Sequence, residues 1–358
     1  PKFRTVMNRR SFLSALGIGS IAPFPAVKNK FRYGISELIS QDIDTPWDSK
    51  RGLLDVFTDL KRHPINKDTL QIHTINVASA DASLIVTPDN EKILVDAGHS
   101  ITKGWYVRNY LNRYNIEELD HIIFTHGHWD HIGGFEDILR NYASGSESII
   151  ETEYENDTRI YQTYDRMLSD YDDKVVHATR GDNIHSETED LAIKIIHPSE
   201  KKVTGGPRPL NDNSCALKIQ YEDTCMLLPS DIERRAENSI IDSNTNIQSD
   251  IIRVCHHGGG NGSTKEFLQE ADPQVGIISC AYNDRFNRPH SDALQRLSDQ
   301  NVKLYWTGVN GSIITESDGS NWSIHKQMNM NRENMLENND KVWKHPCSGY
   351  NYSISDTI

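Results

Sequence analysis

The stretch "FTHGHWDHIGG", Phe124 to Gly134, places three histidines and an aspartate within six residues and ends in paired glycines. Imidazole and carboxylate groups are the ligands that borderline divalent metals prefer. His126 and His128 are two residues apart and can reach one ion from a loop. Asp130 and His131 follow at once, and in a turning backbone they would face a second ion beside the first. The alternative is a chance cluster of polar residues in a surface loop. The surrounding sequence has to distinguish this alternative from a metal-binding loop.

The segments on either side of this loop predict a strand and a helix. "HIIFTH", His121 to His126, has the apolar run of a buried strand. After the glycine pair, apolar residues recur at helical spacing at Phe135, Ile138, Leu139 and Tyr142. The loop therefore lies between the carboxyl end of a strand and the start of a helix, where α/β proteins place their chemistry.

Two further strand ends carry groups of the same kind. "LLPSD" ends an apolar run with Asp231, and "VCHHGG" ends another with His256 and His257. A pair of metal ions needs a carboxylate shared between them and further nitrogen ligands, and these two ends supply both. Each also has a simpler explanation, with Asp231 as the N-cap of a helix over "IERRAEN" and the histidines as a hydrogen-bonded turn pair.

The rest of the chain alternates strand and helix patterns. "LQIHTINVASADASLIVTPDNEKILVDAG" contains three β-rich runs, and residues 107–114 have helical spacing. We interpret residues 144–174 as an acidic insertion with a helix near 160–168. Downstream we expect strands at 174–178 and 191–196, a hairpin over "CALKIQ" and "CMLLPSD", a helix over "STKEFLQEA" with Ser263 as its N-cap, a strand at 275–280, a helix at 291–300 and two or three terminal strands.

Five cysteines lack any C-x-x-C spacing and their number is odd. The predicted hairpin sets Tyr221 opposite Thr224 and Cys225 opposite Gln220, so Cys215 and Cys225 would not face each other. We therefore expect free thiols and no disulfide framework.

The N-terminal sequence resembles a twin-arginine export signal. "MNRRSFLSALGIGSIAPFPA" has adjacent arginines, Arg9 and Arg10, ahead of an apolar stretch without acidic residues. The expected organisation is a signal or membrane anchor at 1–30, a linker at 31–68, the main folded domain at 69–327 and a polar tail at 328–358. This predicts an exported protein, periplasmic or extracellular, that uses the twin-arginine export machinery as a partner.

The formal net charge of −13 argues against stable binding to duplex DNA, because that affinity comes mostly from lysine and arginine neutralising phosphates. It does not exclude phosphate chemistry at a local cationic site.

Taken together, these motifs resemble a known family. "THGHWDHIGG" is similar to the THxHxDHxGG signature of the metallo-β-lactamase superfamily. More narrowly, residues 70–314 resemble the hydrolase domain of the ComEC-like DNA-uptake proteins and their stand-alone relatives. The similarity runs in order through "INVASADASLIVTPDNEKILVDAG", "RGDNI", "IIHPSE", "NDNSCALKIQYEDTCMLLPSDIE", "VCHHGG" and "ISCAYNDRFNRPHSDAL".

The resemblance implies an α/β fold, a four-layer αββα sandwich, with a two-metal hydrolase site at one edge. It assigns His126 and His128 to the first metal, Asp231 to the bridge between the ions, and three residues to the second metal, namely Asp130, His131 and His257. His257 is preferred to His256 because a glycine follows it. Asp96 would orient a metal-binding histidine. We expect two divalent ions, zinc in the first place and manganese as the alternative.

Two departures from the family pattern affect the site. Many superfamily members have another histidine near "NDNSC", where this chain has Asn211, Asp212 and Asn213, so the first metal would be held more weakly. Where the ComEC-like group has Gly-His-Pro, this chain reads Asn287-Arg288-Pro289. We expect Arg288 to support charge on a phosphoryl group, with a surface arginine as the alternative, and His290 to stand in for the missing histidine. Asp130, Arg288 and His290 are thus the catalytic candidates.

The expected function is that of a binuclear metal-dependent phosphodiesterase or nuclease that uses a metal-bridging hydroxide on a small-molecule or short nucleic-acid phosphodiester. One alternative is hydrolysis of a carboxylic ester, thioester, lactone or lactam by the same site. Another is a non-catalytic metal-binding or partner-binding protein.

Overall fold

The computed structural model describes residues 63–327, apart from 155, 185–189 and 282–283. The predicted export signal, most of the predicted linker and the predicted polar tail lie outside the described residues. Within them, no helix has both the length and the apolar character needed to span a membrane.

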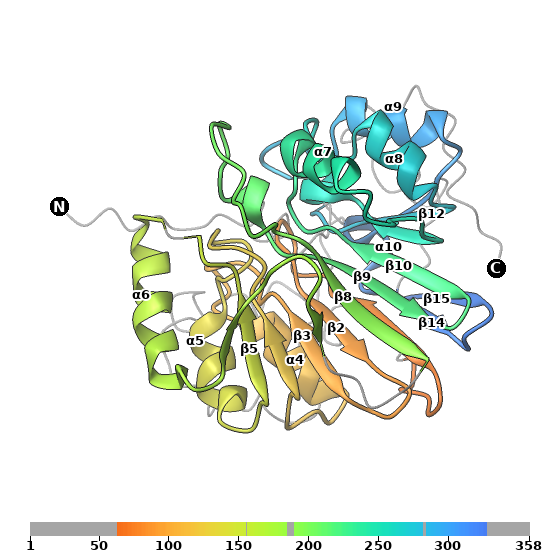
Figure 1. Ribbon diagram of the computed structural model, residues 1–358. Coiled ribbons are helices and arrows are strands. Elements are labelled where there is room, and N and C mark those ends of the chain that lie inside the picture. Colours follow the sequence, from red (N-terminus) through yellow and green to blue (C-terminus); the bar gives the residue numbers. More distant parts are fainter. Residues whose placement is uncertain (1–62, 155, 185–189, 282–283, 328–358) are drawn as a thin grey trace, which may run out of the picture.

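Two β-sheets form the centre of the fold (Figure 1). The first has eight strands in the order β15-β14-β1-β2-β3-β4-β5-β6. Its strands are β1 Leu70–Thr74, β2 Ser83–Val86, β3 Lys92–Val95, β4 His121–Ile123, β5 Ser148–Glu151, β6 Val175–His177, β14 Ile313–Ser317 and β15 Trp322–Lys326. Strands β3 to β6 run parallel to one another, which aligns their carboxyl ends along one edge.

The second sheet has seven strands in the order β13-β12-β11-β10-β9-β8-β7. Its strands are β7 Asn183–Ile184, β8 Leu191–His197, β9 Ala216–Tyr221, β10 Thr224–Leu228, β11 Ile251–Arg253, β12 Val275–Ile278 and β13 Lys303–Trp306. Strands β10 to β13 are parallel, so this sheet also gathers carboxyl ends at one edge.

Helices cover the outer face of each sheet (Figure 1). The first sheet carries α4 Trp105–Arg113, α5 Phe135–Ile138, which continues as a π-helical turn over Leu139–Ala143, and α6 Arg159–Leu168. The second carries α7 Arg234–Asp242, α8 Lys265–Ala271 and α9 Ser291–Asp299, and the short α10 Thr307–Asn310 follows β13.

Three apolar layers hold these elements together, because alternate residues of a strand point to opposite faces of its sheet. On β2, Leu84 packs with the helices of the first sheet, whereas Ile85 packs between the two sheets. A third layer packs α7, α8 and α9 on the second sheet through residues such as Phe267. The expected four-layer αββα sandwich is confirmed.

Two strands were not expected from the sequence, the two-residue β7 and the four-residue β5. Residues 144–174 contain the predicted helix, α6, but also β5, which pairs with β4 and β6 inside the first sheet. The interpretation of the whole segment as an insertion was wrong in this part. Strand β5 has only four residues in an acidic context, and its burial comes from neighbouring strands that lie far away in sequence.

The predicted hairpin of β9 and β10 is confirmed in its register. Thr224 lies opposite Tyr221 and Cys225 lies opposite Gln220. Cys215, Cys225 and two other buried cysteines, Cys255 and Cys280, are free thiols, whereas Cys347 lies outside the described residues.

The N-cap of α8 is displaced by one residue from its predicted place. Thr264 caps the helix, and its side chain accepts from the backbone N–H of Phe267. Ser263 has a left-handed backbone with φ of 48°, and its hydroxyl accepts from the backbone N–H of Cys255 at 3.1 Å. The prediction of Ser263 as the N-cap was wrong because that hydroxyl supports the histidine turn instead.

Glu237 on α7 gives a prediction for stability. Burial raises its pKa to about 7 from an ordinary value of 4.5. The folded state therefore binds the proton more tightly than the unfolded chain, and this contribution, about 3 kcal/mol, is complete below pH ~4.5 and lost as the pH rises through ~7. We expect Glu237→Gln to raise the melting temperature at pH 8 relative to the wild type and to leave a smaller difference at pH 5. Exposed Glu270→Gln is the matched control, and equal pH profiles for all three proteins would contradict the assignment.

Candidate metal centre

The candidate ligands come from loops that follow strands of both sheets. The loop of residues 124–134 follows β4 of the first sheet. Asp231 follows β10, and His256 and His257 lie on the short helical turn Cys255–Gly258 after β11, both in the second sheet. Residues that lie far apart in the sequence thus come together in one cluster at the edge where the two sheets meet.

The paired glycines allow the first of these loops to pack closely on its neighbour. A Cβ on Gly133 would lie 2.0 Å from the backbone nitrogen of Ser100, and one on Gly134 would lie 2.4 Å from the backbone oxygen of Ala97. No side chain fits at either position. The close packing lets the N–H of Ala97 donate to the backbone oxygen of His131 at 2.7 Å, which fixes the loop beside the end of β3.

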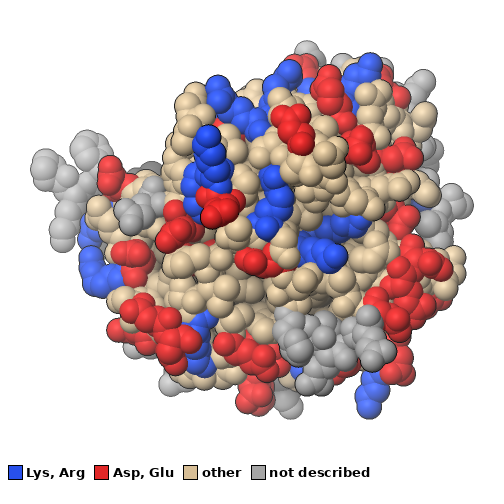
Figure 2. All heavy atoms as spheres, in the orientation of Figure 1, with Lys and Arg blue, Asp and Glu red and all other residues tan. Residues whose placement is uncertain are grey.

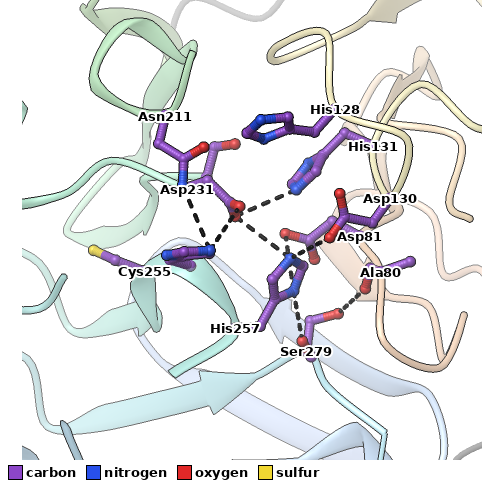
Figure 3. Close-up of polar contacts among 12 residues, drawn as sticks. Ala80, Asp81, His128, Asp130, His131, Asn211, Asp231, Cys255, His257 and Ser279 are labelled. Atoms are coloured by element: carbon purple, nitrogen blue, oxygen red, sulfur yellow. Dashed lines mark hydrogen bonds and ion pairs between the residues drawn. The ribbon is translucent and has the colours of Figure 1, made fainter. Parts of the chain in front are cut away.

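Asp231 stands at the centre of the cluster, and its two carboxylate oxygens face different partners. Oδ1 lies 3.3 Å from His131 Nε2 and 3.5 Å from His257 Nε2. Oδ2 lies 3.9 Å from His126 Nε2 and 3.6 Å from His256 Nε2. Figure 3 shows Asp231 between His131 and His257. This is the arrangement that a carboxylate shared between two metal positions requires.

The remaining predicted ligands complete one group on each side. Asp130 Oδ2 lies 3.7 Å from His257 Nε2, on the Oδ1 side of Asp231. His128 Nδ1 lies 2.8 Å from His126 Nε2, on the Oδ2 side. The structure thus brings all six predicted ligands together.

Groups behind the cluster hold the histidine rings in place. His131 Nδ1 donates to Asp96 Oδ2 at 2.7 Å, and His257 Nδ1 donates to the backbone oxygen of Ser279 at 2.9 Å. Each bond fixes a proton on Nδ1, so Nε2 is the ring nitrogen that faces Asp231. The predicted contact of Asp96 with a ligand histidine is confirmed. The same carboxylate accepts from the backbone N–H and the hydroxyl of Thr125, both at 2.8 Å.

Sequence reasoning missed Asp81, which lies in the connection from β1 to β2. It forms a possible four-residue metal site with His131, Asp231 and His257, and Figure 3 shows it beside them. Its charge is balanced by the fully buried Arg253, whose Nη2 lies 3.1 Å from Asp81 Oδ2. The available signal was one acidic residue within an otherwise small and apolar run, "VASADASLIV".

The buried polar atoms of this cluster fit a bound metal ion. Among the described residues, His131 Nε2, His257 Nε2, Asp231 Oδ1 and Asp81 Oδ1 are buried without a hydrogen-bond partner. Leaving such atoms unpaired is costly, and a divalent cation would satisfy them together. A second possible group joins His126 and His128 to Asp231.

The pKa values of the cluster favour metal-binding protonation states for most of its members. Burial lowers the pKa of His126 and His257, and lowers that of His128 to about 4, so these rings are neutral. Burial alone would raise the pKa of Asp231, but the charge and the hydrogen bond of His131 hold it well below its ordinary range. For His131, burial acts to lower the pKa, yet the charges of Asp231 and Asp96 raise it overall, so a metal would have to displace a proton there.

The two other catalytic candidates have different surroundings. Arg288 is 4 % exposed, so the surface alternative does not apply. Its Nε donates to Asp284 Oδ2 at 3.3 Å, whereas its Nη2 is buried without a hydrogen-bond partner among the described residues. His290 Nδ1 accepts from the backbone N–H of Gly260 at 3.0 Å, and its Nε2 lies 3.0 Å from the backbone oxygen of Phe286. Both nitrogens of His290 are thus bound to backbone, which does not favour the replacement role predicted for it.

Several histidines outside the cluster take structural or exposed positions. His73 bonds to Tyr110, His121 to Ser148, His177 to Glu151 and His197 to the backbone oxygen of Asp212, and His185 lies outside the described residues. The alternative explanation of Asp231 as a helix N-cap is wrong, because Glu233 is the N-cap of α7.

Comparison with known proteins identifies the class. The fold and the donor cluster are those of a metal-dependent hydrolase, and residues 76–281 match the metallo-beta-lactamase superfamily profile. The chain belongs to the metallo-β-lactamase superfamily.

Individual similarities are more distant. The chain is 24 % identical to ComE operon protein 3 of Bacillus subtilis over 270 residues, which cover 68 % of this chain and 32 % of that protein. It is 28 % identical to Recombination protein 2 of Haemophilus influenzae over 261 residues, which cover 72 % and 30 %. The chain therefore spans about a third of the length of these relatives. The metallo-beta-lactamase fold protein YhfI of Bacillus subtilis superposes with a TM-score of 0.46 at 14 % identity, over 70 % of this chain and 100 % of that protein.

The number of donors predicts the metal content. Six predicted ligands, of which five lie on the two sides of the Asp231 carboxylate, exceed what a single tetrahedral ion can use. After reconstitution with zinc or manganese, we expect elemental analysis of the purified protein to give close to two ions per chain. A content near zero would contradict the site.

Proposed function

We propose that this protein is a binuclear metal-dependent phosphodiesterase. The observation that carries the proposal is Arg288, a buried guanidinium with an unpaired Nη2, close enough to Asp130 and Asp231 for their charges to act on it. Burial acts to lower the pKa of Arg288, but neighbouring negative groups, Asp284, Asp130 and Asp231 among them, raise it overall. The group therefore stays charged beside the cluster. A planar fork of donors suits phosphate oxygens better than a carbonyl group, which carries less charge.

Two divalent ions, for which zinc is our first choice and manganese our second, would activate water as the nucleophile and neutralise the phosphoryl oxygens. The residues of the chain would stabilise the developing charge and accept the proton. Arg288 would donate to a non-bridging phosphoryl oxygen as charge develops on it. Asp130, whose Oδ2 lies 3.7 Å from His257 Nε2, would take up the proton that the attacking water releases.

The surface charge supports a small or short substrate. The net charge is −13, so a long polyanion would be repelled over much of the molecule. Figure 2 shows lysine and arginine side chains around the middle of one face, with acidic side chains prominent along its lower edge. We propose a small-molecule phosphodiester or a short nucleic acid as the substrate, and no stable binding of duplex DNA.

Two other functions remain as alternatives. The same donor cluster would serve hydrolysis of a carboxylic ester, thioester, lactone or lactam, in which the nucleophile attacks a carbonyl carbon. A non-catalytic metal-binding or partner-binding protein is favoured only by Asn213, which stands where many relatives have a histidine.

One panel of substrates tests all three functions. We expect the zinc-reconstituted or manganese-reconstituted protein to hydrolyse bis(p-nitrophenyl) phosphate. Faster turnover of a chromogenic lactam or lactone would support the carbonyl alternative, and no turnover of any of them by the metal-loaded protein would support the non-catalytic one.

We also propose that the protein is exported through the twin-arginine machinery, on the sequence pattern around Arg9 and Arg10. Replacing both with lysine keeps the charge but removes the paired guanidiniums. We expect the variant to accumulate inside the cell while the wild type is exported, as judged by cell fractionation. Equal export of the two would point to another route, and a wild type that stays inside would contradict the proposal.

A further inference from the structure

We propose that His256 is the third nitrogen ligand of the first metal position, where it takes the place of the histidine missing near Asn213. The inference rests on the proposed metal centre and adds a residue that the family pattern does not assign. With His256, the first position would have three imidazole nitrogens, from His126, His128 and His256, and one oxygen of Asp231.

The two proposed metal positions are alike in that two imidazole nitrogens lie near each oxygen of Asp231. On the Oδ1 side, His131 and His257 approach with their Nε2 atoms at 3.3 and 3.5 Å. On the Oδ2 side, His126 and His256 approach at 3.9 and 3.6 Å. His256 is thus nearer to the shared carboxylate than His126, a predicted ligand. Each oxygen of Asp231 faces a pair of imidazoles.

The hydrogen bonds of His256 fix the tautomer that a ligand needs. Its Nδ1 lies 2.8 Å from Glu233 Oε1, and an ionised carboxylate can only accept, so Nδ1 carries the proton. Its Nε2 lies 3.4 Å from the amide nitrogen of Asn211, which can only donate, and this places a lone pair on Nε2. Glu233 is in turn bound by Arg208. A carboxylate behind a histidine is the arrangement that typically orients a metal ligand, and Asp96 holds His131 in the same way.

The backbone of the histidine turn directs both rings at one carboxylate. His256 and His257 both have left-handed conformations, with φ of 49° and 56°. Such conformations are unfavourable in a non-glycine residue and persist where the surrounding structure holds them. The N–H of His256 donates to the backbone oxygen of Ser230 at 3.0 Å, which ties the turn to the residue before Asp231.

The other candidates for the missing ligand are engaged elsewhere. The amide nitrogen of Asn213 donates to the backbone oxygens of Val203 and Pro209, and its Oδ1 accepts from the N–H of Val203. Both ring nitrogens of His290 meet backbone groups. These bonds to backbone hold both side chains in place, whereas Nε2 of His256 has one long contact of 3.4 Å with Asn211 and faces Asp231 Oδ2 at 3.6 Å. Three nitrogens and one carboxylate oxygen form a donor set that suits tetrahedral zinc.

Metal binding measured without substrate tests this assignment. The metal-free wild type and His256→Ala would be titrated with Zn²⁺ against a chromophoric chelator. In parallel, the Mn²⁺-loaded proteins would be examined by electron paramagnetic resonance for the coupled signal of two neighbouring ions. Glu233→Gln is the second variant, because it weakens the orientation of the ring and keeps the ring itself. His177→Ala is the matched control, since that histidine pairs with Glu151 and not with Asp231.

We expect His256→Ala to bind one ion normally and the other at least ~10²-fold more weakly, with loss of the coupled signal. Glu233→Gln should weaken the same ion by roughly 10-fold to 100-fold, as removal of a group that orients a ligand typically does. The control should bind both ions like the wild type. Near-wild-type unfolding of the metal-free variants would exclude general misfolding, and if His256→Ala does not fold, the effect of Glu233→Gln decides.

Other outcomes would overturn the assignment. Two ions bound with wild-type affinity by His256→Ala would show that His256 is not a ligand, and a raised KM with unchanged metal binding would make it a substrate contact. The test is separate from that of the proposed function. A wild type that binds two ions but cleaves no phosphodiester would contradict the proposed function alone, whereas a wild type that binds no ion would overturn both.

Discussion

Asp231→Asn is expected to lower turnover by about 10³-fold or more and to reduce the metal content, although the two side chains have nearly the same volume. The amide lacks the negative charge that can hold two cations at once. Both oxygens of Asp231 also face imidazoles, and the charge on His131 holds the pKa of Asp231 well below its ordinary value, which favours the ionised form. Steady-state kinetics with bis(p-nitrophenyl) phosphate and elemental analysis of the same preparation would measure both effects.

Asp212→Asn provides the comparison. Asp212 is also buried, but its backbone oxygen pairs with His197, and its carboxylate forms no ion pair with the histidines of the cluster in the described structure. Unfolding in the presence of metal should show that both variants fold. If Asp231→Asn kept near-normal metal and rate while Asp212→Asn lost them, the bridge would have to be reassigned to Asp212.

Arg288→Ala is expected to lower phosphodiester turnover by roughly 10²-fold or more and to leave the metal content unchanged, as removal of one oriented donor to the transition state typically does. The guanidinium has no lone pair to offer a metal, so its loss should not release an ion. Its effect should fall on kcat more than on KM, because the charge that it meets develops during the reaction. Metal analysis and a full Michaelis profile would separate these effects.

Neighbouring substitutions sharpen this test. Arg288→Lys keeps the charge but not the planar fork, so it should recover only part of the rate. Arg285→Ala removes an exposed guanidinium that stacks 4.6 Å from the ring of Trp129, and a smaller loss is expected there. His290→Ala should be compared as well, and a loss equal to that of Arg288→Ala would return His290 to the list of catalytic candidates. Release of metal from Arg288→Ala, or an unaltered rate, would count against the proposed role.

The strands and helices could be predicted where one short segment carries its own pattern. The loop from Phe124 to Gly134, the hairpin of β9 and β10, and helix α6 all fall in this group, because periodicity and turn residues are local properties. Strand β5 could not be predicted, since its burial depends on β4 and β6 and not on its own four residues.

The sequence predicted the residues of the candidate site only as polar groups at the ends of separate strands. That these ends meet follows from two sheets packed face to face, a long-range property. Asp81 was missed because a single aspartate has no spacing signature, and its importance arises only beside His131 and Arg253. The different positions of His256 and His257 could not be predicted from the sequence either, because a left-handed backbone at both residues directs their rings to different oxygens of Asp231.

The origin of the ligands in different sheets has a thermodynamic consequence. His126, His128, Asp130 and His131 extend from the first sheet, whereas Asp231, His256 and His257 extend from the second. Metal ions bound by both groups of ligands would connect the two sheets along one edge of the sandwich. Their binding free energy would then add to the free energy of unfolding as the free metal concentration rises above the dissociation constant, by about 2.7 kcal/mol at a hundredfold excess over that constant. A chelator would in that case lower the free energy of unfolding, so that the ions proposed for catalysis would also stabilise the packing of the two sheets on each other.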